Sequence, residues 1–478
     1  MTPPADPGSA PLARFEAIGL WLMGLLLIAF GGLVADRSAF QTDRKTDFGV
    51  YARAGFSVRA TLTARYFPSA VPENEEYFPP EARELKYDIY QVCDDRGWHY
   101  CYPPAFAVFM VPLADPFFWE DRTGYLPFGA SVIIWFVINL ILAWYAAHAL
   151  AGAVVPDAVR WSRRWWYART VPLYICLGGI GYTLSRGQVN IVLVALVAGM
   201  FAAAVRGRAV AAGAWLAGAV ALKVIPVFLI LFPLVRREWR TGIGLAAGLF
   251  VLLGVIPAAV WGVEGAVDNN LKVFSAVIAP GSLGVGDQTR QKELTGATST
   301  DSQSFQAVIH NLRYPDKPNR PKVVDKSTRL AHWALSLLMV AVTLVAAWRG
   351  LGPAPADQLV FLGLLCVVML LTTPVSHMHY YAMGLPLVAG LWLKGLAGRP
   401  GEFWAGWCTF GVLMTWGVLT ALPLFPPVMD LGLLDAGLAT FSTVALWAYG
   451  VAVMGRCPRT CPVTRPAARL QPVAAVVA

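Results

Sequence analysis

Long blocks without any charged residue constrain this chain more than any other feature. Six blocks of 19 to 32 residues contain no Asp, Glu, Lys or Arg: 17–35, 125–156, 187–205, 241–263, 403–429 and 436–455. About 20 consecutive apolar residues cross a bilayer as a helix. The sequence therefore predicts an all-α polytopic membrane protein.

Two further stretches and the composition support this class. Residues 330–348 and 358–393 are interrupted only by histidines, and the second is long enough for two crossings with a turn at 374–381. Charged residues make up 14% of the chain, against about 25% in an average soluble domain. The net charge of +9 lies in short clusters rather than on one basic face, which excludes nucleic-acid binding. We expect about 11 to 13 transmembrane helices, including half-helices.

Short basic loops predict which helix ends face the cytoplasm, because such loops stay inside. Counted from a cytoplasmic N-terminus, every basic cluster falls inside if residues 209–235 leave and return on the same side. That segment is too short for two full helices, and Lys223 and Pro226 interrupt it, so we expect a pair of broken helices. The clusters are Arg160/Arg163/Arg164/Arg169, Arg206/Arg208, Arg236/Arg237/Arg240, Arg349 and Lys394/Arg399.

The same count divides the chain into a cytoplasmic N-terminus (1–15), one transmembrane domain (16–455) and a basic cytoplasmic tail (456–478). Two polar segments, about 36–124 and 264–329, are expected outside the cytoplasm. We expect an uncleaved N-terminal anchor, since a small-residue cleavage site is lacking. A bacterial-type inner membrane location with an active site facing outside the cytoplasm follows, and the oligomeric state is left open.

The first outer segment contains two cysteines and a short apolar run. Cys93 and Cys101 are separated by seven residues, and an oxidising exterior favours a disulfide between them; two thiols are the alternative. Residues 105–113 follow Pro103-Pro104 and are too few to span, which predicts a short re-entrant or interfacial helix begun by proline. Cys457 and Cys461 in the tail have no histidine nearby, and we predict no metal site there.

An acid and a lysine stand out near the membrane. Asp47 follows the first span in Asp47-Phe48-Gly49-Val50-Tyr51, where residue type alone favours a helix N-cap. Lys223 is a charge within the membrane, which costs roughly 2.5–3.5 kcal/mol at a helix centre. An anionic partner or a water-filled cavity would explain it, and so would snorkelling to the interface.

Two polar turns lie between apolar runs. In Arg186-Gly187-Gln188-Val189-Asn190 the two amides can bind sugar hydroxyls or cap helix ends. In Ser376-His377-Met378-His379-Tyr380 the two histidines can bind a metal or donate to a phosphate, and the sequence identifies no third metal ligand.

These motifs occur in the order found in a known family. The motifs are Asp47-Phe48-x-Val50-Tyr51, Tyr102-Pro103-Pro104, Gly187-Gln188-x-Asn190, Lys223-x-x-Pro226 and Ser376-His377-x-His379-Tyr380. Together they resemble the polyprenyl-phosphate-mannose-dependent alpha-1,2-mannosyltransferases of the GT-C superfamily, which include phosphatidylinositol-mannoside mannosyltransferases. The resemblance implies a GT-C-like bundle with two long extracytoplasmic loops.

The resemblance also implies a reaction: a hexose, mannose in that family, moves from a polyprenyl-phosphate donor to a lipid-linked or glycan acceptor with inversion. Asp47 would be the general base. The donor phosphate would be bound by His377, His379, Lys223 and Arg186. The sugar and acceptor would be bound by Tyr51, Tyr102, Gln188, Asn190 and Tyr380. The need for a divalent metal is left open.

A transporter or flippase of lipid-linked sugars is the alternative function. It predicts internal repeats and polar residues near the bilayer midplane of several helices. The sequence shows no convincing internal repeat, and most polar residues collect at the expected outer helix ends. A non-catalytic envelope assembly protein is less favoured, because the membrane lysine and the histidine pair would have no purpose there. The glycosyltransferase is therefore preferred.

Overall fold

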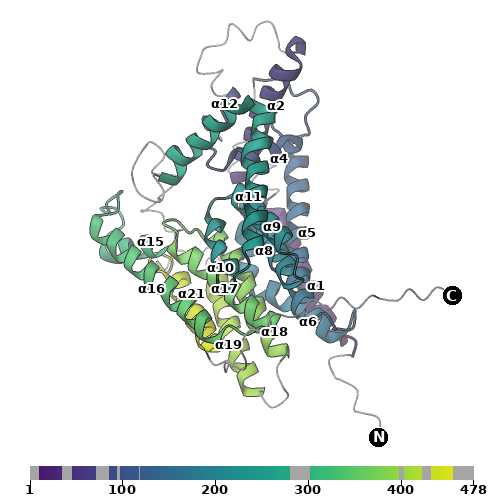
Figure 1. Cartoon of the computed structure of the whole chain (residues 1–478), viewed down its shortest axis with the longest axis vertical. Helices are drawn as coiled ribbons and strands as arrows, with labels where there is room; N and C mark the ends of the chain where they lie inside the picture. The colour runs from purple at the N-terminus through teal and green to yellow at the C-terminus, as the bar shows by residue number, and fades with distance from the viewer. Residues whose placement is uncertain are drawn as a thin grey trace, which may run out of the picture.

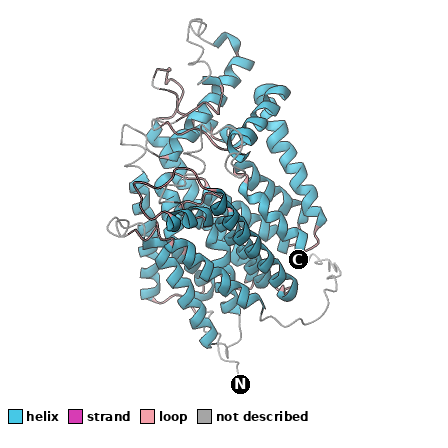
Figure 2. Cartoon of the chain, turned by 90° about the vertical axis from the view of Figure 1, so that its left-hand side faces the viewer, coloured by secondary structure: helices cyan, strands magenta, loops and turns pink. Residues whose placement is uncertain are grey.

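The structure is a computed structural model that describes residues 10–34, 46–70, 86–93, 97–117, 119–279, 302–397, 403–422 and 432–455. Helices and connecting loops make up these residues, and the only β-pairing among them is two isolated bridges (Figure 2). The predicted tail with Cys457 and Cys461, the middle of the second outer segment (280–301) and part of the first (36–45, 71–85) lie outside the described residues.

The helices follow one another in this order in the first half of the chain: α1 (Arg14–Val34), α2 (Asp47–Tyr66), η3 (Pro68–Ala70), α4 (Pro104–Phe109), η5 (Val111–Leu113), α5 (Phe128–Val154), α6 (Arg163–Ile175), α7 (Leu177–Arg186), α8 (Asn190–Val205), α9 (Ala209–Leu222), η6 (Ile225–Ile230) and α10 (Leu231–Val235). The second half contains α11 (Trp239–Leu249), η7 (Phe250–Val255), α12 (Ile256–Val273), η8 (Phe274–Ile278), α15 (Phe305–Arg313), α16 (Lys326–Gly350), α17 (Pro355–Thr372), η9 (Met378–Gly384), α18 (Leu385–Ala397), α19 (Phe403–Ala421) and α21 (Leu438–Gly455). Figure 1 shows α2, α4 and α12 at the top of the view and α6, α18 and α19 near the bottom.

Helix length and apolar composition confirm the predicted class. Among the described residues, six helical stretches are long and apolar enough to cross a membrane, and shorter apolar helices such as α8 and α9 accompany them. The first stretch, in α1, is mostly exposed, whereas most residues of α17 are buried inside the bundle. An exposed apolar helix is stable only in lipid, while a helix that is apolar all round belongs in a core. The chain is an all-α polytopic membrane protein.

Small residues allow the closest helix packing. A Cβ at Gly213 in α9 would lie 2.1 Å from the Thr241 carbonyl oxygen of α11, so these helices touch backbone to backbone. α8 packs between α5 and α9, and α17 packs along α18. Such small-residue contacts drive helix association in membranes, where apolar side chains gain little by leaving lipid.

The break predicted in 209–235 is confirmed. α9 ends at Leu222, Lys223 is extended with φ −155° and ψ 126°, and η6 begins at Ile225 with Pro226 in its first turn. The short helix predicted after Pro103 is also present, because α4 begins at Pro104 and contains only six residues. A proline in the first helical turn forfeits no hydrogen bond, since the first amides have no partner within the helix.

The second outer segment begins differently from the prediction. Residues 264–279 are helical and continue a 40-residue helical stretch from Trp239 to Ile278, with a kink at Gly262 (φ 78°). The three charged residues of this part, Glu264, Asp268 and Lys272, recur every fourth position and share one stripe. The other positions carry no charge, so the charged residues end the uncharged block without ending the helix.

The starts and ends of the helices define two ends of the bundle, which carry different kinds of residue. α7, α9 and α17 end where α2, α8 and η9 begin, and Arg186, Lys223 and the histidine pair lie at that end. The basic clusters lie at the other ends of the same helices, as with Arg206 after α8 and Lys394 near the end of α18. The 16 residues of α8 separate the two ends by about 24 Å.

Candidate active site

A cavity of about 690 Å³ lies at the end of the bundle where α2 and α8 begin. It is large enough for a headgroup, since ligand pockets commonly measure about 300–1,000 Å³. Nine of the ten site residues predicted from the sequence line it, and Asn190 is the exception. The nine come from the start of α2, the segment before α4, the α7–α8 turn, the end of α9 and η9.

Asp47 is the first residue of α2 and faces this cavity. The N-cap position belongs to Thr46, so the interpretation of Asp47 as an N-cap is wrong. Its Oδ2 accepts a hydrogen bond of 2.6 Å from Gln188 Nε2. A carboxylate in the first helical turn is stabilised by the positive end of the helix dipole. Asp47 therefore lies at the positive end of α2, beside the cavity.

Tyr51 and Tyr102 complete a polar network with Gln188. The Tyr51 hydroxyl lies 2.8 Å from the Tyr102 hydroxyl and 2.9 Å from Gln188 Oε1, and the Tyr102 hydroxyl lies 3.3 Å from the same oxygen. The two rings meet edge to face at 5.1 Å, and Phe106 of α4 packs against both. Rigid aromatic packing fixes the hydroxyls at one wall of the cavity.

Lys223 is held inside the protein and does not snorkel. Only 9% of the residue is exposed, and its Nζ donates to Asn190 Oδ1 at 3.3 Å. The same ammonium lies 3.7 Å from the centroid of the Tyr380 ring, within cation–π range. The extended backbone between α9 and η6 directs the side chain into the cavity. A positive charge is thereby available to an anionic ligand.

The histidine pair lies close to Lys223, in the turn that opens η9, because Asn190 bonds both Lys223 and the His379 backbone. The His377 and His379 rings stack at 5.4 Å, and both line the cavity. The second outer segment fixes this turn: Ser302 forms a β-bridge with His377, and Gln303 N donates to Ser376 O at 2.6 Å. Gln303 therefore supports this turn through its backbone without lining the cavity.

The α7–α8 turn carries Arg186 into the cavity and fixes the start of α2. Gly187 is left-handed (φ 64°), and a Cβ there would lie 2.8 Å from Phe48 Cβ. Trp135 Nε1 of α5 donates to Gly187 O at 2.8 Å. Only glycine combines this backbone conformation with such close packing.

Sequence reasoning missed the apolar wall of the cavity. η6 contributes Ile225 and Phe228, η8 contributes Val277, and α16 contributes Trp333. The uncharged residues that directly follow Lys223 could have indicated that η6 lies against the cavity. The contributions of η8 and α16 depend on chain segments far apart and left no local signal. Trp98 and His99 also line the cavity.

Cys93 and Cys101 belong to the segment that precedes α4. Cys93 pairs with His99 in an antiparallel bridge, and Cys93 O accepts from Arg53 at 2.9 Å. Both cysteines are thiols in the structure, and their disulfide stays a prediction. Among the described residues, no three His, Cys, Asp or Glu side chains are grouped so as to hold a metal ion.

Comparison with known proteins shows which family this chain belongs to. The model of glycosyltransferase family 87 matches residues 100–374, which include Tyr102, Arg186, Gln188 and Lys223. Two relatives are named polyprenol-phosphate-mannose-dependent alpha-(1-2)-phosphatidylinositol mannoside mannosyltransferase. The Mycolicibacterium smegmatis protein is 25% identical over 68% of this chain and 68% of its own length. The Mycobacterium tuberculosis protein is 27% identical over 68% and 69%.

Among solved structures, ArnT from Cupriavidus metallidurans bound to undecaprenyl phosphate covers 93% of this chain and 77% of its own, at 13% identity and a TM-score of 0.40. That overlap is too loose to carry an argument about the site. The family model, in contrast, spans more than half of the chain and most walls of the cavity. The chain belongs to glycosyltransferase family 87 and is a membrane glycosyltransferase.

Proposed function

We propose that this enzyme transfers mannose from a polyprenyl-phosphate donor to a hydroxyl of a lipid-linked or glycan acceptor. The observation that carries the proposal is one cavity that combines a carboxylate, four cationic or proton-donating side chains and an apolar wall. Those features match, in turn, an acceptor hydroxyl, a donor phosphate and a prenyl chain. The names of the two mycobacterial relatives support the same donor and sugar.

Asp47 acts as the general base in this proposal. The acceptor oxygen attacks the anomeric carbon and gives its proton to Asp47. The bond between that carbon and the phosphate oxygen breaks, and the polyprenyl phosphate leaves with the electron pair. A single attack from the face opposite the phosphate inverts the anomeric centre, so a beta-linked donor yields an alpha product. Proton transfer of this kind contributes about 10²–10⁴-fold in rate.

The leaving phosphate is stabilised by the cationic side of the cavity. His377, His379, Lys223 and Arg186 all line it, and charge that grows on the phosphate is best met by donors already in place. Tyr380 lies beneath the Lys223 ammonium and limits where it points. Whether a divalent metal assists is a question for the transfer assay, with and without a chelator.

The apolar wall is the proposed path of the prenyl chain. Val224, Val227 and Phe228 continue from Lys223, so the phosphate and the first isoprene units would be bound by consecutive residues of one segment. Burial of each CH₂ contributes about 0.8 kcal/mol. A chain that extends sideways from this wall reaches lipid without crossing the polar part of the cavity.

The cavity is proposed to face outside the cytoplasm. Basic clusters lie at the helix ends opposite it, where Arg206 and Arg208 join α8 to α9 and Arg349 ends α16. Short loops rich in such residues stay in the cytoplasm. The cavity end then meets the outer leaflet of the cell membrane. In this topology, residues 1–15 and 456–478 are cytoplasmic and residues 16–455 form the transmembrane domain.

A transfer assay with the purified enzyme in nanodiscs tests the proposal. Synthetic polyprenyl-phosphate mannose with an isotope-labelled sugar is supplied together with a panel of phosphatidylinositol mannosides, and products are identified by mass spectrometry. We expect a labelled hexose on the acceptor in an alpha linkage. Labelled donor that is bound without transfer to any acceptor, or a beta-linked product, would contradict the proposal.

A further inference from the structure

The amide of Gln188 is used by the protein rather than offered to a ligand. Its Nε2 donates to Asp47 Oδ2 at 2.6 Å, and its Oε1 lies 2.9 Å from the Tyr51 hydroxyl and 3.3 Å from the Tyr102 hydroxyl. The residue is 5% exposed. Both ends of the amide are thus engaged, and the shortest contact is to the carboxylate.

The amide of Asn190, two residues later, is used in the same way. Its Oδ1 accepts from Lys223 Nζ at 3.3 Å, and its Nδ2 donates to His379 O at 3.0 Å. Asn190 is fully buried and does not line the cavity. It reaches the ligand space only through the two residues that it contacts.

The turn that carries both amides is rigid. Gln188 N donates to Thr183 O at 2.9 Å, which closes the end of α7, and Thr183 Oγ1 donates to His379 O at 2.9 Å. Gly187 packs against Phe48, the neighbour of Asp47 in α2. Movement of this turn would therefore displace the carboxylate and the cationic group together.

We infer that the α7–α8 turn is a positioning element, in which Gln188 orients Asp47 and Asn190 orients Lys223 and the His379 segment. This inference rests on the proposed function, and it replaces the expectation that the two amides bind the sugar or acceptor. One turn sets the direction of the proton acceptor and of the phosphate-binding charge. A fixed geometry between such groups is what a reaction in line with the leaving phosphate requires.

The two amides are predicted to affect different kinetic constants. Gln188→Leu removes the donor to Asp47, so kcat should fall by about 10- to 100-fold while the Kd for the donor stays within about threefold. Gln188→Glu keeps the size of the side chain but faces Asp47 with an oxygen, and it should lower kcat in the same way. Gln188→Glu is the variant to measure if Gln188→Leu does not fold.

Asn190→Leu should act mainly on donor binding. Lys223 loses the acceptor that directs it, so the Kd for the donor should rise about tenfold, and kcat should fall less than in Gln188→Leu. Asn139→Leu is the matched control, because Asn139 is a buried amide whose Nδ2 donates within its own helix, to Trp135 O. The control should retain both constants of the unmodified enzyme.

Each outcome of these measurements decides a specific question. A tenfold rise in donor Kd with unchanged kcat in Gln188→Leu would show that Gln188 binds the sugar, and unchanged constants in both variants would also overturn the inference. An unmodified enzyme that binds donor but transfers nothing would contradict the proposed function and the inference with it. Turnover by the unmodified enzyme together with an unchanged kcat in Gln188→Leu would overturn the positioning role alone.

Discussion

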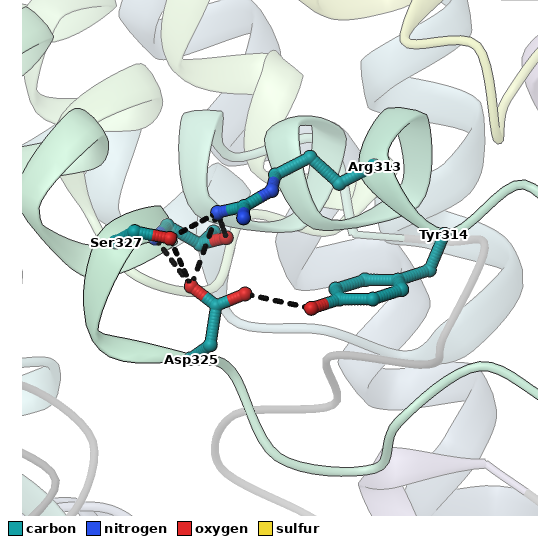
Figure 3. A network of polar contacts seen from close by, with 5 residues as sticks. Arg313, Tyr314, Asp325 and Ser327 are labelled. Atoms are coloured by element: carbon teal, nitrogen blue, oxygen red, sulfur yellow. Dashed lines mark hydrogen bonds and ion pairs between the residues drawn. The ribbon is translucent and has the colours of Figure 1, made fainter.

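Two aspartates at helix starts illustrate how differently this protein uses the same residue. Asp325 is the N-cap of α16, where its Oδ1 accepts from Thr328 N at 2.7 Å and Ser327 Oγ at 2.8 Å, and its Oδ2 accepts from Tyr314. Figure 3 shows these bonds, with Arg313 of α15 completing the cluster. Asp47 is not a cap, and its carboxylate faces a cavity.

The difference lies in what each carboxylate is bonded to. The Thr328 amide and the Ser327 hydroxyl hold the pKa of Asp325 well below its usual range, so this side chain stays charged and serves the fold. Asp47 accepts a hydrogen bond from Gln188, a side chain 141 positions away, and borders space for a ligand. Local bonds indicate a structural aspartate, whereas a distant partner beside a cavity indicates a functional one.

The largest effect on sugar transfer is expected when the Asp47 carboxylate is exchanged for an amide. Asp47→Asn should reduce sugar transfer by about 10²–10⁴-fold, because an amide cannot take the proton. The variant should still fold and bind the donor. Asp325→Asn, its matched control, should transfer sugar at near the unmodified rate per folded molecule. Initial rates in nanodiscs check both, and near-normal transfer by Asp47→Asn would remove it as the base.

The next comparison is between the histidines of the cavity and a histidine of α15. Joint replacement of His377 and His379 by Gln should weaken donor affinity about 10- to 100-fold and acceptor use much less, since charge-assisted bonds to a phosphate are lost. His310 of α15 is buried and lies 2.8 Å from Pro321 O, so His310→Gln should lower the melting temperature without changing donor affinity. Equal loss on donor and acceptor in the double variant would assign the pair to the fold.

Two glycines with positive φ allow the effect of backbone strain to be measured separately from the effect of a close contact. Gly187→Ala adds a Cβ against Phe48 and should displace α2, which lowers transfer about tenfold. Gly207→Ala has a similar φ (72°) and no atom within 4 Å of the new Cβ, so only backbone strain of about 1 kcal/mol is added. Transfer rates and melting temperatures of both variants distinguish the effects. Equal activity in the two would show that the Phe48 contact is unimportant.

The smallest expected effect is the pH dependence of the Asp325 cap. Because its folded pKa is lowered, the carboxylate stabilises the protein fully above the unfolded pKa of about 3.9, and this contribution disappears as the pH falls below that value. The melting temperature of Asp325→Asn should be about 2 °C lower than that of the unmodified protein near neutral pH. The gap should narrow progressively as the pH falls below about 4, toward the lower folded pKa. A constant gap across pH would contradict the role of the charge.

Local sequence patterns predicted much of the fold. Uncharged blocks indicated helices such as α5 and α21, and Lys223 with Pro226 indicated the break after α9. The extension of α12 beyond Glu264 was missed, because charged residues on one stripe hid a helix whose other positions are uncharged. Hydropathy averages over all faces of a helix, whereas packing depends on each face separately.

The candidate site could be predicted as a set of residues but not as a set of roles. Motif positions indicated Asp47, Lys223 and the histidine pair, and the structure brings them to one cavity. Gln188 and Asn190 were predicted to bind the sugar or acceptor or to cap helix ends, and the proposed positioning role had no sequence signal, since an amide's partners cannot be deduced from its own sequence. Their bonds run to side chains 141 and 33 positions away, which only the folded chain brings together.

The most direct test of the central claim is a cryo-electron microscopy structure of Asp47→Asn in nanodiscs with polyprenyl-phosphate mannose bound. We predict the donor phosphate within hydrogen-bond distance of His377, His379 or Lys223, with the anomeric carbon presenting its opposite face to position 47. A donor phosphate bound outside this cavity, or position 47 on the same side of the sugar as the phosphate, would contradict the account.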